Sequence, residues 1–195
     1  MKHEIILASG SPRRRKMLED LGYQLEVKKP EVEEKREIDE PVLEYLMRNA
    51  LIKGESIAKN ANANSDQVIL SADTIVVLDG ELLEKPSDSA DACKTLQRLS
   101  DRSHEVWSAV AIFRNTKLVK HFSHCTQVKF GKIPVAAIED YVATGAAADK
   151  AGSYGIQERI GYYVERINGS YQNIVGLPLY EVTLALRELG VKPDS

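Results

Sequence analysis

The beginning of the chain most constrains its fold. An apolar run over residues 5–8 is followed by Ser9-Gly-Ser-Pro12 and then by apolar residues at helical spacing over residues 17–21. This pattern predicts a strand, a tight loop and a helix. Ser11 is a preferred N-cap residue, and proline suits the first helical turn because its missing N–H would be unpaired there anyway. The predicted loop therefore presents backbone N–H groups at the positive end of a helix.

The same loop has the features of an anion site. Two serine hydroxyls lie in it, and Arg13, Arg14 and Arg15 follow. Three arginines at the positive end of a helix oppose the helix dipole, which suggests that they bind phosphate. The alternative is a capped helix with a solvated basic first turn. No G-x-x-x-x-G-K-[ST] string occurs in the chain, so a kinase or ATPase of that class loses its main support.

Composition excludes several classes of protein. The 195 residues allow one domain with a substantial core, and 43% hydrophobic and 28% charged residues are ordinary for a soluble protein. A net charge of −3 and 6% aromatic residues argue against nucleic-acid binding. Cys93 and Cys125 lie far apart without metal-ligand spacing, so we expect reduced thiols. No leader pattern and no membrane-span pattern occurs, so we expect a cytoplasmic protein without membrane contact.

Strand and helix patterns alternate along the rest of the chain. Strands are expected over residues 23–28, 67–72, 75–78, 105–113, 118–130 and 162–167, and helices over residues 41–58, 90–99, 135–143 and 180–189. There is no internal repeat and no low-complexity tract. We therefore expect residues 1–195 to form a single domain.

Several charged residues occur at sequence positions where a charge indicates a structural or functional role. Asp73 interrupts an apolar β-type run, where an unpaired carboxylate would be costly, so it is either hydrogen-bonded for structure or carries a metal or a proton. Lys53 lies beside the apolar stripe of its helix, either as a snorkelling lysine or as a phosphate contact. Lys85 stands at the end of a strand, and Glu34 lies in the charge-rich segment 30–37.

Together these residues indicate phosphate chemistry with a divalent metal. Several cations would offset the charge of a polyphosphate, and carboxylates supply the oxygen ligands of a hard metal ion. The chain shows no Ser/His/Asp or Cys/His pattern for acyl transfer. Further candidates are Lys150, Asp149 and the glycine-bounded loop that ends at Gln157.

Six sequence blocks carry a resemblance to a known family. They are Leu7-Ala-Ser-Gly-Ser-Pro-Arg-Arg14 with Leu18, Ala72-Asp-Thr74, Lys85-Pro86, Leu99-Ser100 with His104, Asp149-Lys-Ala-Gly-Ser-Tyr-Gly-Ile-Gln157, and Gly169-Ser-Tyr-Gln-Asn-Ile-Val-Gly-Leu-Pro178. In this order, over nearly the whole chain, they resemble the Maf family of nucleotide pyrophosphatases, and most of all its dTTP/UTP branch.

The resemblance implies both a fold and an activity. The fold would be a mixed α/β one, related to inosine triphosphate pyrophosphatases, with a strongly twisted sheet flanked by helices and two lobes around a central cleft. The protein would be an enzyme, commonly a homodimer, that uses Mg²⁺ or Mn²⁺ to hydrolyse dTTP/UTP-type nucleoside triphosphates, modified ones included, to monophosphate and pyrophosphate. The alternative is a catalytically weak nucleotide-binding regulator of cell division or stress response.

The resemblance also implies roles for individual residues. Asp73 would be the catalytic carboxylate, which accepts a proton from water or holds the metal, and Glu34 would be the second metal ligand. Arg14, Thr74 and Gln157 correspond to specificity positions. The triphosphate would be bound by Ser9, Arg13, Lys53 and Lys85.

The chain departs from the family pattern at four places, at two of which Glu84 and Asp101 replace the more usual glycines of G-K-P and L-S-G. It has Gly145-Ala-Ala147 where the family usually has Gly-Glu-Pro, so an acid that could assist metal or water placement is absent. It also has Glu158 where glycine is common. Reduced activity or altered substrate choice would follow from these changes.

Overall fold

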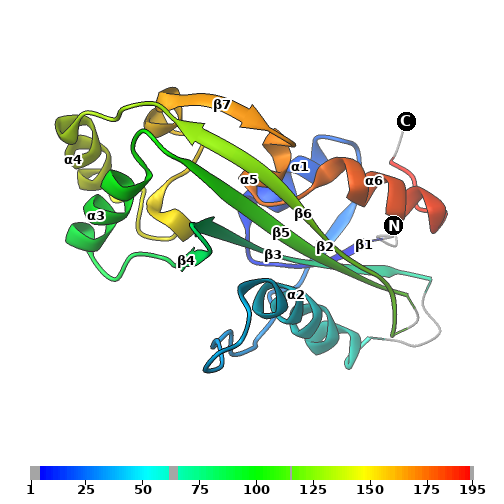
Figure 1. Ribbon diagram of the computed structural model, residues 1–195. Helices are drawn as coiled ribbons and strands as arrows, with labels where there is room; N and C mark the ends of the chain where they lie inside the picture. The colour runs from blue at the N-terminus through cyan, green and yellow to red at the C-terminus, as the bar shows by residue number, and fades with distance from the viewer. Residues whose placement is uncertain (1–4, 62–65, 115, 194–195) are drawn as a thin grey trace. The chain divides into compact units, whose positions relative to one another are not determined.

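Strands and helices alternate along the chain in the computed structural model, which describes residues 5–61, 66–114 and 116–193 (Figure 1). The strands are β1 (Ile5–Ala8), β2 (Leu25–Val27), β3 (Val68–Leu78), β4 (Glu81–Leu83), β5 (Ser103–Arg114), β6 (Lys117–Phe130) and β7 (Val164–Asn168). The α-helices are α1 (Pro12–Glu19), α2 (Val42–Ala58), α3 (Ser89–Leu99), α4 (Val135–Ala143), α5 (Tyr171–Val175) and α6 (Leu179–Glu188). Two short 3₁₀ helices are η1 (Ala151–Ser153) and η2 (Arg159–Tyr163).

The strands form a mixed sheet in the order β2-β1-β3-β5-β6-β7, with β4 paired to β3. Strand β1 is parallel to both β2 and β3, whereas β4 is antiparallel to β3 and β7 is antiparallel to β6. Parallel neighbours require crossover connections, and helices α1 and α2 lie in those connections. The mixed α/β class predicted from the sequence is thereby confirmed.

The described residues divide into two compact units. The first takes the chain up to residue 73, residues 108–124 and the chain from residue 176; the second takes residues 74–107 and 125–175. Strands β3, β5 and β6 contribute residues to both units. That residues 1–195 form a single domain stays a prediction.

Alternating side chains give the first unit two apolar clusters. On β1, Ile5 and Leu7 belong to one cluster, while Ile6 and Ala8 belong to the other. Strands β3 and β5 alternate in the same way, as the period of two in a strand requires. The first cluster includes residues of α1 and α6, and the second is covered by α2, so helices lie on both faces of these strands (Figure 1). Burial on both faces explains why the strands of this unit are rich in apolar residues.

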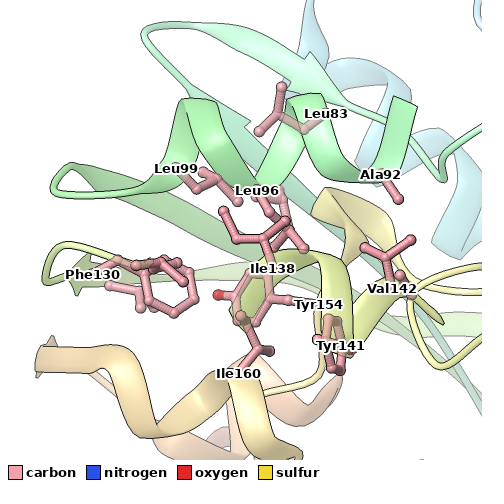
Figure 2. Close-up of a cluster of buried hydrophobic side chains, with 14 of the residues drawn as sticks. Leu83, Ala92, Leu96, Leu99, Phe130, Ile138, Tyr141, Val142, Tyr154 and Ile160 are labelled. Carbon is pink, nitrogen blue, oxygen red and sulfur yellow. The ribbon is translucent and has the colours of Figure 1, made fainter. Parts of the chain in front are cut away.

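The second unit has its own core. Helices α3 and α4 and the 3₁₀ segments pack against residues of β3, β4, β5 and β6 (Figure 2). Buried members of this cluster are Leu83, Leu96, Leu99, Phe130, Ile138, Tyr141, Tyr154 and Ile160. The core therefore holds α4 and the segment around Tyr154 in place.

Two sequence predictions about strands are wrong. Residues 67–72 and 75–78 were expected as two interrupted runs, but β3 is continuous through its polar residues. The physical reason is that these residues have partners: Ser71 is fully buried, and its hydroxyl donates to the carbonyl of Ala50 at 2.7 Å. The strand expected over residues 162–167 begins at Val164, because residues 159–163 form η2.

Helix length and polarity also bear on the membrane prediction. Among the helices of the described residues, none has both the length and the apolar character that crossing a bilayer requires.

Candidate active site

The loop between β1 and α1 is closed by its own serines. The Ser9 hydroxyl is buried and accepts a hydrogen bond from the Ser11 N–H at 3.2 Å. Ser11 is the N-cap of α1, and its hydroxyl accepts from the Arg14 N–H at 3.4 Å. Pro12 is the first helical residue, as predicted. Both hydroxyls therefore shape the loop, and a direct contact of Ser9 with substrate stays a prediction.

Arg14 is a buried connector between three segments. Its Nε donates to the carbonyl of Gly176 at 2.7 Å, and one terminal nitrogen donates to the carbonyl of Ala72 at 2.9 Å. The same nitrogen donates to the Ser9 hydroxyl at 3.3 Å. Burial lowers the pKa of the guanidinium, and the charge of nearby Asp73 acts against that shift. Arg14 thus ties the β1 loop and the strand residue before Asp73 to the segment that leads into α6.

Arg13 and Arg15 differ from Arg14 in their exposure. Arg13 is partly buried in the first turn of α1, where the loop N–H groups also lie. Arg15 is exposed and forms an i,i+4 ion pair with Glu19 at 2.7 Å. Of the three arginines, Arg14 therefore has buried partners in the protein, Arg15 lies on the surface and Arg13 remains a candidate phosphate contact. The contact of Arg14 with substrate stays a prediction.

A lysine between two carboxylates forms the centre of the candidate site. Lys53 Nζ lies 2.7 Å from Asp73 Oδ1 and 2.7 Å from Glu34 Oε2. The Lys53 side chain is only 9% exposed, whereas that of Glu34 is 44% exposed. Helix α2 supplies the lysine and β3 supplies the aspartate. The structure thus brings together three of the residues that the resemblance implied.

Asn49 is a member of this site that sequence reasoning missed. It lies one helical turn before Lys53 on α2, is fully buried, and its Nδ2 donates to Asp73 Oδ2 at 3.3 Å. Its Oδ1 is buried and has no hydrogen-bond partner among the described residues. The spacing of four residues on one helix was the available signal, since i and i+4 side chains share a face.

The segment that carries Glu34 is fixed on α2. The Tyr45 hydroxyl donates to the Glu34 carbonyl at 2.9 Å. Arg48 donates to both carboxylate oxygens of Glu40 at 2.7 Å, and to the carbonyl of Lys35 at 2.9 Å. The bidentate pair lowers the pKa of the Glu40 carboxyl to about 2. A charge-rich stretch that would ordinarily be a solvated loop is therefore held where Glu34 reaches Lys53.

Three other predicted site residues lie in the second unit. Thr74 follows Asp73 on β3 and is partly buried, while Lys85, after β4, and Gln157, after η1, are exposed. The contact of these three residues with substrate stays a prediction.

The electrostatics of the first unit suit a divalent cation. Two carboxylates meet at the ammonium of Lys53, so a single positive charge is already placed between them. Within residues 5–61, 66–114 and 116–193, no group of three or more His, Cys, Asp or Glu side chains gathers in a way that could hold a metal ion. Magnesium is commonly held by one or two carboxylates together with substrate phosphates, so this pair fits that kind of site.

The first unit combines a mixed α/β sheet with a strand–helix loop that holds two serines and with a carboxylate pair around a lysine, features that suit the binding of a metal–phosphate compound. A family model described as "Maf-like protein" matches residues 4–189, and the chain belongs to the Maf family.

Relatives of the chain support the same family. It is 45% identical over 191 residues to a protein of Salmonella typhimurium named dTTP/UTP pyrophosphatase, covering 98% of this chain and 95% of that protein. It is 43% identical over 187 residues to a Vibrio vulnificus protein of the same name, covering 95% and 98%. The fold is similar to the solved structure of a HAM1 protein from Coxiella burnetii, with a TM-score of 0.55 and 16% identity over 96% of this chain and 100% of that one.

Proposed function

We propose that the protein is a nucleoside triphosphate pyrophosphatase that hydrolyses dTTP/UTP-type nucleotides, modified ones included, to the monophosphate and pyrophosphate. The observation that carries this proposal is the position of the Lys53 ammonium between Asp73 and Glu34, in a chain 45% identical to a relative with that name. A cation and two carboxylates at one place are what the binding of a metal–triphosphate complex needs.

The proposed chemistry is one displacement at the α-phosphorus. A water oxygen attacks, the bond from the α-phosphorus to the bridging oxygen breaks, and pyrophosphate leaves. Asp73 Oδ2, which Asn49 orients at 3.3 Å, accepts the proton of the attacking water. Lys53 shifts its ammonium from the carboxylates to the triphosphate, and Arg13 and the N–H groups of the β1 loop offset the remaining charge.

Glu34 and Asp73 would hold the metal. Their oxygens already meet at one cation, each 2.7 Å from Lys53 Nζ. A divalent ion, Mg²⁺ or Mn²⁺, supplies charge neutralisation and polarises the phosphate when it is bound. The family resemblance supports Lys85 as a further phosphate contact, and Arg14, Thr74 and Gln157 as the residues that choose the nucleobase.

Pyrophosphate release tests the proposed function. The purified protein is given a panel of nucleoside triphosphates with Mg²⁺ or Mn²⁺, and the monophosphate and pyrophosphate are measured. We expect turnover of dTTP and UTP, and a loss of about 10³-fold in D73N because the proton acceptor is gone. D79N is the matched control, since Asp79 is exposed at the turn between β3 and β4. Near-normal turnover by D73N would refute the mechanism.

The second candidate is a catalytically weak nucleotide-binding regulator of cell division or stress response. It is favoured by Ala146, which stands where the family usually has glutamate. In the same assay, tight binding of nucleotide without pyrophosphate release would support it. The expected homodimer, the cytoplasmic location and the lack of nucleic-acid or membrane partners stay predictions, and sedimentation of the purified protein would test the dimer.

A further inference from the structure

Gln157 lies in a turn whose two ends are held by one side chain. The turn covers residues 155–158, and it is closed by the Glu158 N–H, which donates to the Gly155 carbonyl at 3.0 Å. The Tyr141 hydroxyl accepts from the Gly155 N–H at 3.1 Å and donates to Glu158 Oε2. A single hydroxyl on α4 therefore fixes both the first and the last residue of the turn, while the Gln157 side chain between them is exposed.

Gly155 and Glu158 both contribute to this arrangement. A Cβ on residue 155 would lie 2.9 Å from the carboxylate carbon of Glu158, so a larger residue there would make the Glu158 side chain shift. Glycine at position 158, which is common in the family, would leave the Tyr141 hydroxyl without this acceptor. The clamp is thus a property of this chain's own residues.

A lysine holds the carboxylate from its other side. Lys150 Nζ lies 3.1 Å from Glu158 Oε1 and 2.8 Å from Asp149 Oδ1, and it also donates to the carbonyl of Ala146. The Lys150 side chain is only 10% exposed, and the carboxylates of Asp149 and Glu158 compensate its positive charge. Lys150 therefore links the Glu158 carboxylate to the carbonyl of Ala146, the residue that stands where the family usually has an acid.

The Tyr141 hydroxyl keeps its proton at working pH. Burial, and then the hydrogen bond to the Glu158 carboxylate, raise the pKa of Tyr141 well above its ordinary value. Tyr141 itself is 4% exposed and packs in the core of the second unit (Figure 2). The ring that carries the hydroxyl therefore cannot move without disturbing that core.

We propose that Tyr141 and Glu158 are positioning residues that hold the Gln157 turn and thereby set the choice of nucleobase. This rests on the proposed function, in which Gln157 contacts the base. A side-chain amide offers one donor group and one acceptor, which suits the O4 and N3–H edge of uracil and thymine. Fixing the backbone beneath it reduces the ordering that binding must bring about, so selectivity depends on the clamp.

The test measures selectivity for UTP over CTP, as the ratio of their kcat/KM values. We expect Y141F and E158A to lower this ratio about 5- to 10-fold, mainly through the KM for UTP. Y141F removes both hydrogen bonds of the hydroxyl to the turn, and E158A removes the one to residue 158. E158Q keeps an oxygen that can accept from Tyr141, so we expect it to lose less than E158A. Y162F is the matched control, since Tyr162 is 89% exposed on η2.

A double mutant separates positioning from a general structural effect. If Tyr141 acts through Gln157, Y141F will not change the ratio further in a Q157A background. Additive effects of Y141F and Q157A, or an unchanged ratio in both Y141F and E158A, would overturn the inference while leaving the proposed function intact. A wild-type protein that releases no pyrophosphate would instead overturn the proposed function, and this inference with it.

Discussion

Lys53 Nζ and Asp73 Oδ1 lie 2.7 Å apart, and the lysine is nearly excluded from solvent while its second carboxylate, Glu34, is 44% exposed. The pair joins α2 to the middle of β3, so it contributes to the stability of the first unit as well as to the proposed chemistry. Removal of one partner would leave the other charge in a partly buried place without compensation, which is the costly case.

Substitution of Lys53 by methionine is expected to reduce both stability and turnover. K53M leaves Asp73 and Glu34 facing each other without a cation, and we expect the free energy of unfolding to fall by about 2 kcal/mol. Pyrophosphate release should fall about 10²-fold or more, because a preorganised cation for the triphosphate is lost. Denaturant unfolding and steady-state kinetics measure the two effects.

K59M is the control for this change. Lys59 is the exposed residue that follows the last turn of the same helix. Its substitution should leave both quantities within experimental error, and turnover in K53M equal to that of K59M would contradict the proposed role of Lys53.

Metal binding in the absence of nucleotide should be weak. The ammonium of Lys53 lies between the two carboxylates that would hold the ion, so a free cation competes with it. We expect Mn²⁺ alone to bind wild-type protein weakly and K53M about tenfold more tightly, because like-charged neighbours disfavour each other. Electron paramagnetic resonance of free Mn²⁺ reports binding without turnover. E34Q/K53M is the control, and Mn²⁺ binding that is no tighter in K53M than in the wild type would argue against the carboxylate pair as the metal site.

Arg14 and Arg15 offer a matched pair of substitutions. R14M removes donors to the carbonyls of Ala72 and Gly176 from a residue that is 9% exposed, and we expect it to cost about 2–4 kcal/mol of unfolding free energy. R15M removes only an exposed i,i+4 ion pair, so its cost should stay below about 0.5 kcal/mol. Thermal and denaturant unfolding measure both; equal costs for the two variants would refute the connector role of Arg14.

Local sequence rules predicted the start of the first unit well. The strand, the Ser11 cap, Pro12 at the first helical position and α1 all follow from spacing and capping preferences of adjacent residues. The long strand patterns over residues 105–113 and 118–130 likewise lie within β5 and β6. Such features depend on neighbours in the chain, so the sequence alone carries them.

What the sequence could not predict depends on partners far along the chain. Asp73 seemed to interrupt a strand because its compensating groups, Lys53 and Asn49, come from a helix that precedes β3. From the sequence alone, Arg14 had the features of a phosphate ligand. Its partners in the structure are backbone carbonyls, which every residue has, so residue type could not predict them. The resemblance to a family implied a specificity role for Arg14, and the structure adds that its guanidinium donates to carbonyls of the protein itself.

His104 gives the second unit a predictable dependence on pH. It is 3% exposed, and its Nε2 lies 2.7 Å from the Tyr154 hydroxyl oxygen. Its ring stacks on that of Phe130, with the two ring centroids 5.5 Å apart. Burial lowers the pKa of His104 from its ordinary 6.5 to about 4. Because the unfolded chain binds this proton more tightly, the contribution of His104 is complete above the unfolded pKa. It is lost as the pH falls from about 6.5 towards 4.

The expected effect is a loss of stability on mild acidification. Between pH 7 and pH 5, protonation of His104 in the unfolded chain should remove about 2 kcal/mol from the unfolding free energy. The unfolding free energy of H104F should not show this loss between the two pH values, whatever the absolute stability of the variant. H124F is the control, because the His124 side chain is 27% exposed and pairs with Glu181 at 3.0 Å. Denaturant unfolding at the two pH values measures the difference, and the same pH dependence in H104F and wild type would show that His104 titrates normally in the folded protein.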